Sequence, residues 1–258
     1  MVKLPQPSLS TIQGNRWLGK AIDTIKTLII ASAIALLFRT FLYEPFNIPS
    51  SSMEPTLDVG DYIFVSKFAY GYSDASLPLG LRLLPGRIFF HPPHRGDVAV
   101  FKFPRDDTTD YIKRIVGLPG DRIQVKEGLL YINGTPVQRQ RIGAYLFHTD
   151  GVTIPATEYL ETFPNGESHH ILEFNEEGPF ENTPVFVVPP DHYFVMGDNR
   201  DDSADSRVPN SGVGFVPAEN LVGRAEFIFF SIGGTSPSWE FWKWPFEIRY
   251  ARLFMSID

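Results

Sequence analysis

One apolar stretch limits what this chain can fold into more than any other feature. Residues 27–38 read TLIIASAIALLF and contain no charged side chain. A transmembrane helix needs about 20 mostly apolar residues, and residues 22–43 supply that length if Asp23, Lys26 and Arg39 are included. Charged side chains near the ends of a span can reach the lipid head groups, so they do not exclude one. Periodicity alone leaves a buried core helix as the alternative, but we expect residues 22–43 to be one transmembrane anchor.

The flanks of this stretch predict its orientation. Positive charges before a first span favour a cytoplasmic N-terminus, and the basic residues here are Lys3, Arg16, Lys20 and Lys26. A cleaved secretory signal is less favoured, because the sequence that follows, EPFNIPSSSM, has two prolines and no small-x-small cleavage site. We therefore expect residues 1–21 in the cytoplasm and residues 44–258 on the far side of the membrane.

Beyond the apolar stretch, the sequence predicts strands rather than helices. The 22 Pro and 21 Gly residues are spread along the whole chain, which argues against a helical bundle. Runs of β-branched and aromatic residues, bounded by Gly, Pro or Asp, predict short strands within residues 61–68, 97–104, 110–125, 192–198 and 221–232. Residues 128–137 predict a hairpin, because Asn133 and Gly134 suit its left-handed turn positions. The expected fold class is therefore mainly β.

Two further regions stand apart from these strands. Residues 139–190 are polar and irregular, and they indicate most of an inserted, looser subdomain that spans residues 124–190. The final stretch, residues 236–258, carries Trp239, Trp242 and Trp244, followed by two Arg. These aromatic residues could cover the core or lie in a lipid head-group layer, which suits Trp and basic side chains. An anchor at the other end of the chain favours the second interpretation.

Composition excludes several partners and chemistries. A net charge of −7 argues against nucleic acid as a partner, because phosphate contacts need a basic face. The chain has no Cys, which excludes a thiol nucleophile, disulfides, iron–sulfur clusters and thiolate zinc sites.

No motif predicts a metal site or a histidine-based catalytic site. Residues 196–207, MGDNRDDSADSR, hold four Asp, but their spacing is not that of an EF-hand loop, whose twelfth residue is Glu where this chain has Arg207. A solvated acidic loop and a scaffold around an active site remain as alternatives. His91 and His94 flank two prolines without a nearby carboxylate, so the Ser-His-Asp arrangement has little support.

A serine with a lysine is the nucleophile and base that the sequence does offer. Residues 49–57, PSSSMEPTL, place three consecutive Ser directly after the expected anchor. Lys113 is the only Lys in the otherwise apolar strand stretch YIKRIVGLPGD. Burial lowers the pKa of an amine because it disfavours the charged form, and a neutral amine can take the proton of a serine hydroxyl.

Four ordered motifs resemble those of bacterial type I signal peptidases, also called leader peptidases. PSSSMEPTL with GDYIFVSKFAYG is similar to the serine box of that family, and RGDVAVFKFP is similar to its next box. DYIKRIVGLPGD resembles the lysine box, and GDNRDDSADSR followed by GFVP resembles the last box. The resemblance covers nearly the whole catalytic region but says little of residues 124–190. It implies an antiparallel β-sheet catalytic core of the Ser-Lys protease type, with an inserted β-rich subdomain, behind one N-terminal transmembrane helix.

The resemblance also implies catalytic roles. Ser52, the Ser directly before Met, would be the nucleophile, and Lys113 would be the general base. The hydroxyl of Ser50 and the backbone N–H of Ser52 would form the oxyanion hole, and Ser203 would orient the lysine amine. One departure is Ser51, which stands where many members have Gly and adds a third hydroxyl to the segment.

Supporting and substrate-binding residues follow in the same way. Asp198 with Arg114, and Asp205 with Arg207, would be ion pairs that brace the site, whereas the alternative is surface pairing of little energetic value. Small apolar pockets that favour Ala before the cut would be formed by Ile48, Met53, Leu57, Tyr111 and Ile112. The longer gap before GFVP, at residues 208–213, should only enlarge a loop.

The implied activity is removal of N-terminal signal sequences from exported precursors by a membrane-anchored serine endopeptidase. Its partners would be those precursors and the lipid bilayer, with no cofactor, no metal and no nucleic acid. The expected location is the bacterial inner membrane, with a single pass and a periplasmic catalytic region. The alternatives are a self-cleaving repressor-type Ser/Lys protease, an inactive membrane-tethered peptide-binding module, and an organellar inner-membrane processing peptidase.

Overall fold

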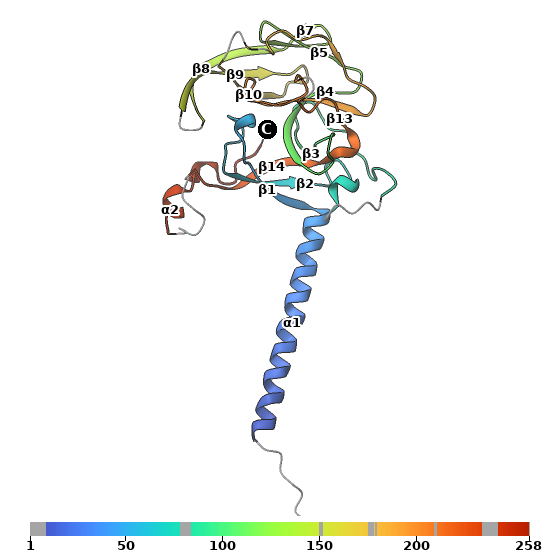
Figure 1. The fold of residues 1–258 in the computed structure, drawn as a ribbon, viewed down its shortest axis with the longest axis vertical. Helices are drawn as coiled ribbons and strands as arrows, with labels where there is room; N and C mark the ends of the chain where they lie inside the picture. Colours follow the sequence, from blue (N-terminus) through green and yellow to red (C-terminus); the bar gives the residue numbers. More distant parts are fainter. Residues whose placement is uncertain are drawn as a thin grey trace, which may run out of the picture.

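The structure is a computed structural model that describes residues 9–77, 84–149, 152–174, 178, 180–208, 211–233 and 242–257 of the 258. For residues 9–16 it describes the backbone alone. One long helix leaves a body built from three β-sheets (Figure 1). The mainly antiparallel β fold predicted from the sequence is confirmed.

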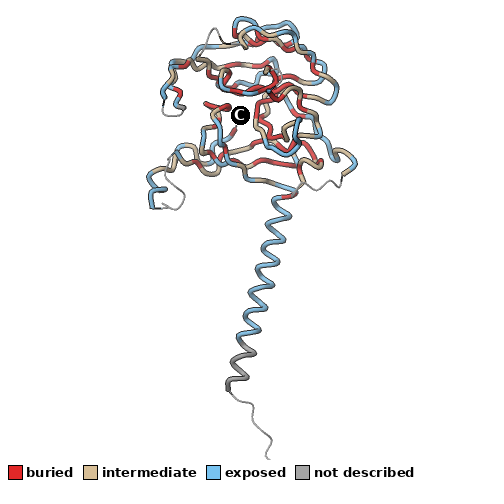
Figure 2. The backbone as a smooth tube through the Cα atoms, viewed as in Figure 1, coloured by how far each residue is buried: buried red, intermediate tan, exposed pale blue. Residues whose placement is uncertain are grey.

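Helix α1 (Leu9–Phe41) is a single 33-residue helix that projects away from the sheets. Its segment Trp17–Phe41 is long and apolar enough to cross a membrane, and its most apolar window is 0% buried. Figure 2 shows the same exposure along the coloured part of the helix until it meets the sheets. The alternative of a buried core helix is therefore wrong for this structure. The helix begins well before residue 22 and ends at Phe41.

A seven-stranded antiparallel sheet carries the residues of interest. Its strand order is β1-β2-β14-β3-β4-β12-β13, so strands far apart in the sequence lie side by side. The strands are β1 (Tyr43–Asn47), β2 (Asp61–Ser66), β3 (Val98–Lys102), β4 (Asp110–Gly117), β12 (His192–Met196), β13 (Val216–Pro217) and β14 (Leu221–Ser231). All but β1 and β13 lie in stretches that their β-branched and aromatic residues predict as strands.

A second, four-stranded sheet contains the predicted hairpin. Its order is β11-β5-β6-β7, and its strands are β5 (Arg122–Lys126), β6 (Leu129–Ile132), β7 (Thr135–Pro136) and β11 (Phe186–Val187). Asn133 and Gly134 join β6 to β7 with φ angles of 54° and 83°, which is the left-handed conformation that a tight hairpin turn requires. The predicted hairpin is confirmed.

A third sheet lies within the insertion, in keeping with the β-rich subdomain that the resemblance implies, although the sequence after residue 139 is polar and irregular. Strands β8 (Gln138–Thr149), β9 (Val152–Thr162) and β10 (Ser168–Glu173) form an antiparallel meander with the order β10-β9-β8. The two longest strands have 12 and 11 residues. Few of their side chains are fully buried. The sequence therefore shows little of the polar–apolar alternation from which a strand is predicted.

Buried apolar side chains fix the segment that carries the three serines. Ile48, Met53 and Leu57 pack in one cluster with side chains from β2, β3 and β14, among them Val65 and Ile228. In Figure 2 the buried parts of the chain gather in the sheets. Burying a large apolar side chain contributes about 1.5–3 kcal/mol. The cluster therefore holds the short turn between β1 and β2 firmly in place.

The C-terminal segment folds back onto β2. Arg252 pairs with Asp61 at 2.6 Å and secures the segment there. The short helix α2 (Trp244–Glu247) lies on the side of the sheets from which α1 leaves (Figure 1). Trp242 beside it is 54% exposed. Trp239, the first Trp of this predicted tail, lies outside the described residues.

Candidate active site

Ser52 lies in a single 3₁₀ turn, Ser51–Met53, that follows β1. Two contacts of Met53 fix the turn. Its side chain is fully buried in the core, and its carbonyl oxygen accepts the backbone N–H of Leu57 at 2.9 Å. Ser52 itself is 8% exposed. Its hydroxyl thus has a fixed position close to the surface of the main sheet.

Lys113, from the middle of β4, brings its amine to this hydroxyl. Its Nζ donates to Ser52 Oγ at 2.6 Å and to the carbonyl oxygen of Ile112 at 2.9 Å. The two side chains are 61 residues apart in the sequence, and the sheet brings them together. Lys113 is 4% exposed, and this burial lowers the pKa of its amine from 10.5 to about 8. A larger fraction of neutral amine at neutral pH is what a general base requires.

Three carboxylates limit how far the pKa of Lys113 falls. Asp205, Asp198 and Asp202 each favour the charged amine, and they partly offset the effect of burial. All three lie in the acidic motif at residues 196–207. Among the alternatives for that motif, the scaffold around an active site agrees with this placement.

The three hydroxyls of the serine segment have different partners. Ser52 Oγ is the one that receives the hydrogen bond of Lys113. Ser50 Oγ lies 3.3 Å from Ser52 Oγ, which is close enough to contact a group that is bound at Ser52. Ser51 Oγ donates instead to the carboxylate of Asp202. Geometry therefore separates the three hydroxyls, and Ser52 is the one beside the Lys113 amine.

Ser203 is brought to the site without the expected hydrogen bond. Its Oγ is buried and has no hydrogen-bond partner among the described residues. Gly197 lies beside it: a Cβ on Gly197 would come within 2.4 Å of Ser203 Oγ and of the Ser52 carbonyl oxygen. The lack of a side chain at Gly197 thus lets the acidic motif approach the serine turn closely. The lysine-orienting role of Ser203 stays a prediction.

Both expected ion pairs are present, and both are buried. Arg114 Nε and Nη2 donate to the two carboxylate oxygens of Asp198 at 2.8 and 2.7 Å. Arg207 donates in the same way to Asp205 at 3.0 and 2.9 Å. Burial alone would raise the pKa of Asp198, but Arg114 more than offsets it and holds that pKa below its usual range. The alternative of exposed surface pairs does not apply.

The structure adds residues that no sequence argument singled out. The backbone N–H of Asn199 donates to the Ser52 carbonyl oxygen at 3.2 Å, and its side-chain amide donates to the Ser51 carbonyl at 3.4 Å. Thr56 Oγ1 donates to Asp198 at 2.6 Å. Asn199 lies in the motif at residues 196–207, which the sequence identifies. Its contact with Ser52 uses the backbone N–H, which no residue pattern predicts.

The meander also contacts the acidic motif. Leu172 of β10 donates its N–H to the carbonyl of Asp198, and the N–H of Arg200 donates to the Leu172 carbonyl, both at 2.9 Å. Arg200 forms a bidentate ion pair with Glu161 of β9. Glu161 lies in a polar stretch without a motif, and nothing in the sequence distinguishes it from its neighbours.

The predicted substrate-binding residues lie at different depths. Ile48, Met53 and Leu57 are buried in the core cluster, and Ile112 is half-buried against the same cluster. Tyr111 is half-buried and stacks on the ring of Phe103 with ring centroids 4.8 Å apart. Their contact with a substrate stays a prediction.

No metal-binding group is found within the part of the chain that the structure describes: no three His, Cys, Asp or Glu side chains there could hold a metal ion together. His91 and His94 are exposed loop residues.

Comparison with known proteins places these features in a family. Residues 21–230 match the model of the family described as "Signal peptidase, peptidase S26". The signal peptidase I of Rickettsia typhi is 39% identical over 241 residues, which cover 87% of this chain and 89% of that protein. The signal peptidase I of Rickettsia conorii is 41% identical over 234 residues, 87% of this chain and 82% of that protein. A crystal structure of a signal peptidase I from Enterococcus faecalis is 26% identical, with a TM-score of 0.30, over 52% of this chain and 97% of that one.

Proposed function

The chain belongs to the signal peptidase family, peptidase S26, and is a serine endopeptidase; on that premise we propose that Ser52 and Lys113 are the catalytic dyad with which it removes signal peptides from exported precursors. The observation that carries the proposal is the 2.6 Å hydrogen bond from Lys113 Nζ to Ser52 Oγ inside a buried site. Asp198, Arg114, Asp205 and Arg207 support this site rather than react, because each is already paired.

The reaction proceeds by proton transfers through one amine. Neutral Lys113 takes the proton of Ser52 Oγ, which attacks the scissile carbonyl, and the protonated amine then gives that proton to the leaving amino group. A water molecule, deprotonated by the same amine, cleaves the acyl-enzyme and restores Ser52. The hydroxyl of Ser50 and the N–H of Ser52 stabilise the oxyanion, in keeping with the 3.3 Å between the two hydroxyl oxygens. The buried Ser203 Oγ turns to orient the amine.

The substrate binds as an added strand between two free strand edges. Within the described residues β1 pairs only with β2, and residues 110–113 of β4 pair only with β3. An extended peptide can hydrogen-bond to such edges, and a peptide on the edge of β4 reaches Lys113 directly. The small residue before the cut fits beside the half-buried Ile112, which packs against the buried cluster of Ile48, Met53 and Leu57, with Tyr111 next to it.

The membrane holds the enzyme where signal peptides emerge. We assign α1 as the single anchor, with the N-terminus in the cytoplasm and the catalytic region on the periplasmic face of the bacterial inner membrane. The exposed apolar surface of α1 and the basic residues before it support this assignment. Helix α2 lies on the side from which α1 leaves (Figure 1). Phe246 within α2 and Trp242 just before it are 90% and 54% exposed, as suits side chains in a head-group layer. The proposal involves no metal, cofactor or nucleic acid.

Cleavage of a secretory precursor in detergent tests the dyad. The intact chain should cut after a small-x-small sequence, and both Ser52→Ala and Lys113→Met should abolish the cut. Ser51→Ala is the matched control, because it removes a neighbouring hydroxyl that contacts Asp202 rather than the amine, and it should retain cleavage. Activity of Ser52→Ala would overturn the nucleophile assignment, and an intact chain that never cuts a proven precursor would favour a tethered peptide-binding module.

A further inference from the structure

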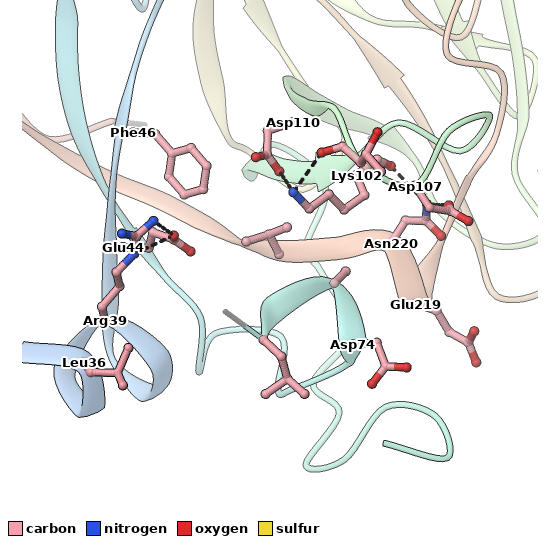
Figure 3. A pocket seen from close by; sticks show the side chains of 14 residues that line it. Leu36, Arg39, Glu44, Phe46, Asp74, Lys102, Asp107, Asp110, Glu219 and Asn220 are labelled. Atoms are coloured by element: carbon pink, nitrogen blue, oxygen red, sulfur yellow. Dashed lines mark hydrogen bonds and ion pairs between the residues drawn. The ribbon is translucent and has the colours of Figure 1, made fainter. Parts of the chain in front are cut away.

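A pocket of about 710 Å³ lies between the end of α1 and the start of β4 (Figure 3). It is formed by parts of the chain that are distant in sequence: Leu36, Arg39, Glu44, Phe46, Asp74, Ala75, Leu77, Lys102, Asp107, Thr108, Asp110, Glu219, Asn220 and Val222. None of these residues is assigned a part in the dyad or its supports. The volume is in the range of pockets that hold a small molecule or a few side chains.

The pocket continues the two edges between which the substrate strand is proposed to bind. Phe46 lies on β1, six positions before Ser52, and Asp110 opens β4, three positions before Lys113. Three residues of strand span about 10 Å, so the pocket lies that far from the amine in the direction of α1. Phe46 also packs against the core cluster that contains Met53. A peptide that extends from the dyad toward the membrane therefore passes into this pocket.

The lining combines apolar and acidic surface. Leu36, Phe46, Ala75, Leu77 and Val222 supply the apolar part. Among the residues that the structure describes, the charged side chains of the lining are the five carboxylates Glu44, Asp74, Asp107, Asp110 and Glu219 and the two cations Arg39 and Lys102. Both cations are paired with carboxylates of the pocket, Arg39 with Glu44 at 2.6 Å and Lys102 with Asp110 at 2.8 Å. Lys67 behind the lining also pairs with Glu44, at 2.7 Å. Among the described residues, the lining therefore carries more carboxylates than cations.

We propose that this pocket receives the part of the precursor about four to six residues before the cut, and that it selects neutral or basic side chains there against acidic ones. The inference rests on the proposed function. Negative charge concentrated in a concave site attracts cations and repels anions. The size of the pocket permits large side chains, in contrast to the small residue required directly before the cut. Leu36 and Arg39 place its outer end at the last turns of α1, where the apolar part of a signal peptide would enter the bilayer beside the anchor.

Three precursors that differ only at the fifth residue before the cut test this selectivity. With Ala, Lys and Glu at that position, kcat/KM should be similar for Ala and Lys and about tenfold lower for Glu in dilute buffer, and the difference should shrink at high salt. The enzyme variant Asp74→Asn/Glu219→Gln keeps the shapes of two pocket side chains and removes their charge, and it should reduce the penalty for Glu. The matched control is Glu158→Gln/Asp191→Asn, which removes two carboxylates outside the pocket and should leave the penalty unchanged.

The outcomes separate this inference from the proposed function. Equal kcat/KM for all three precursors, or a Glu penalty that is the same in the pocket variant and the control, would overturn the pocket assignment while leaving the peptidase activity in place. Failure to cut the Ala precursor would overturn the proposed function and this inference with it.

Discussion

The carboxylate of Glu161 and the guanidinium of Arg200 form a buried ion pair, with Nη1 and Oε1 3.0 Å apart, that joins the meander to the acidic motif. Burial would lower the pKa of Arg200, but Glu161 outweighs it and keeps the guanidinium charged. The residue before Arg200 is Asn199, whose N–H donates to the Ser52 carbonyl. The inserted strands are therefore connected to the serine turn, Ser51–Met53, through one short segment.

Replacing Glu161 should weaken both the fold and the site. Glu161→Gln leaves the charge of Arg200 buried without its counter-charge, which costs about 3–5 kcal/mol. We expect a lower thermal midpoint, and a kcat reduced at least about tenfold, ~1.4 kcal/mol, with a smaller change in KM because the substrate edges are untouched. Glu158→Gln is the control, since Glu158 lies on the same strand and pairs with the exposed His170.

A double variant shows whether the loss comes from the unpaired charge. Glu161→Gln/Arg200→Gln removes both charges and should recover part of the lost thermal stability. If Glu161→Gln behaves like Glu158→Gln in both kcat and thermal midpoint, the meander does not position the serine turn.

Asp202 and Ser51 share a hydrogen bond but should differ in their effect on pH dependence. The carboxylate of Asp202 favours the charged form of Lys113 and so raises its pKa. Asp202→Asn should therefore lower that pKa and move the rising limb of the kcat/KM profile to lower pH. Ser51→Ala removes the same hydrogen bond but keeps the carboxylate, so its limb should stay in place. An identical shift of the limb in both variants would mean that the hydrogen bond from Ser51 to Asp202, and not the charge of Asp202, raises the pKa of Lys113.

Lys113→Met should stabilise the fold while it abolishes cleavage. The pKa of Lys113 is lowered from 10.5 to about 8 in the folded chain. Between pH 8 and 10.5 Lys113 is therefore protonated in the unfolded chain and neutral in the folded one. The wild type accordingly gains stability as pH rises from about 8 to 10.5, and it carries the full cost of the buried charge below 8. At pH 7 the variant should unfold with a free energy up to about 3 kcal/mol higher, and the advantage should shrink by pH 10. Denaturant titrations in detergent measure it, and a less stable variant at pH 7 would contradict the cause assigned to the shift.

Ser203→Ala should separate activity from stability. The buried Ser203 Oγ has no partner among the described residues, and removing an unsatisfied hydroxyl costs little or is stabilising. Loss of a lysine-orienting hydrogen bond during the reaction should lower kcat about tenfold. Thermal unfolding with steady-state kinetics checks both parts. Unchanged kcat would remove Ser203 from the proposed mechanism.

The strands of the main sheet and the N-terminal apolar helix could be predicted because they depend on local pattern. Residues 97–104 and 221–232 are rich in β-branched and aromatic residues, which favour strands. Asn133 and Gly134 favour the left-handed conformation of a tight hairpin turn. The meander has little local strand signal, because its strands are solvated and carry little apolar periodicity, and only the resemblance implies a β-rich insertion there. Its true structure depends on pairing between strands, which a local pattern does not encode.

The candidate site could be predicted in its parts but not in its contacts. Ser52 and Lys113 were identified from motifs that the chain shares with a known family. The link between Glu161 and Arg200 depends on two segments that meet only in the folded chain, so sequence spacing gives no signal for it. The separation of Ser51 from Ser52 likewise comes from the partner each hydroxyl finds, Asp202 or Lys113.

The pH dependence of kcat/KM for the intact chain tests most directly whether Lys113 acts as a neutral base. Only the deprotonated amine can accept the Ser52 proton, so the rate should rise with pH along a single limb with an apparent pKa of about 8. The measurement uses one precursor in detergent, with Ser51→Ala as a variant that should show the same limb. A limb centred near the ordinary lysine value of 10.5, or cleavage that persists in Lys113→Met, would contradict the account.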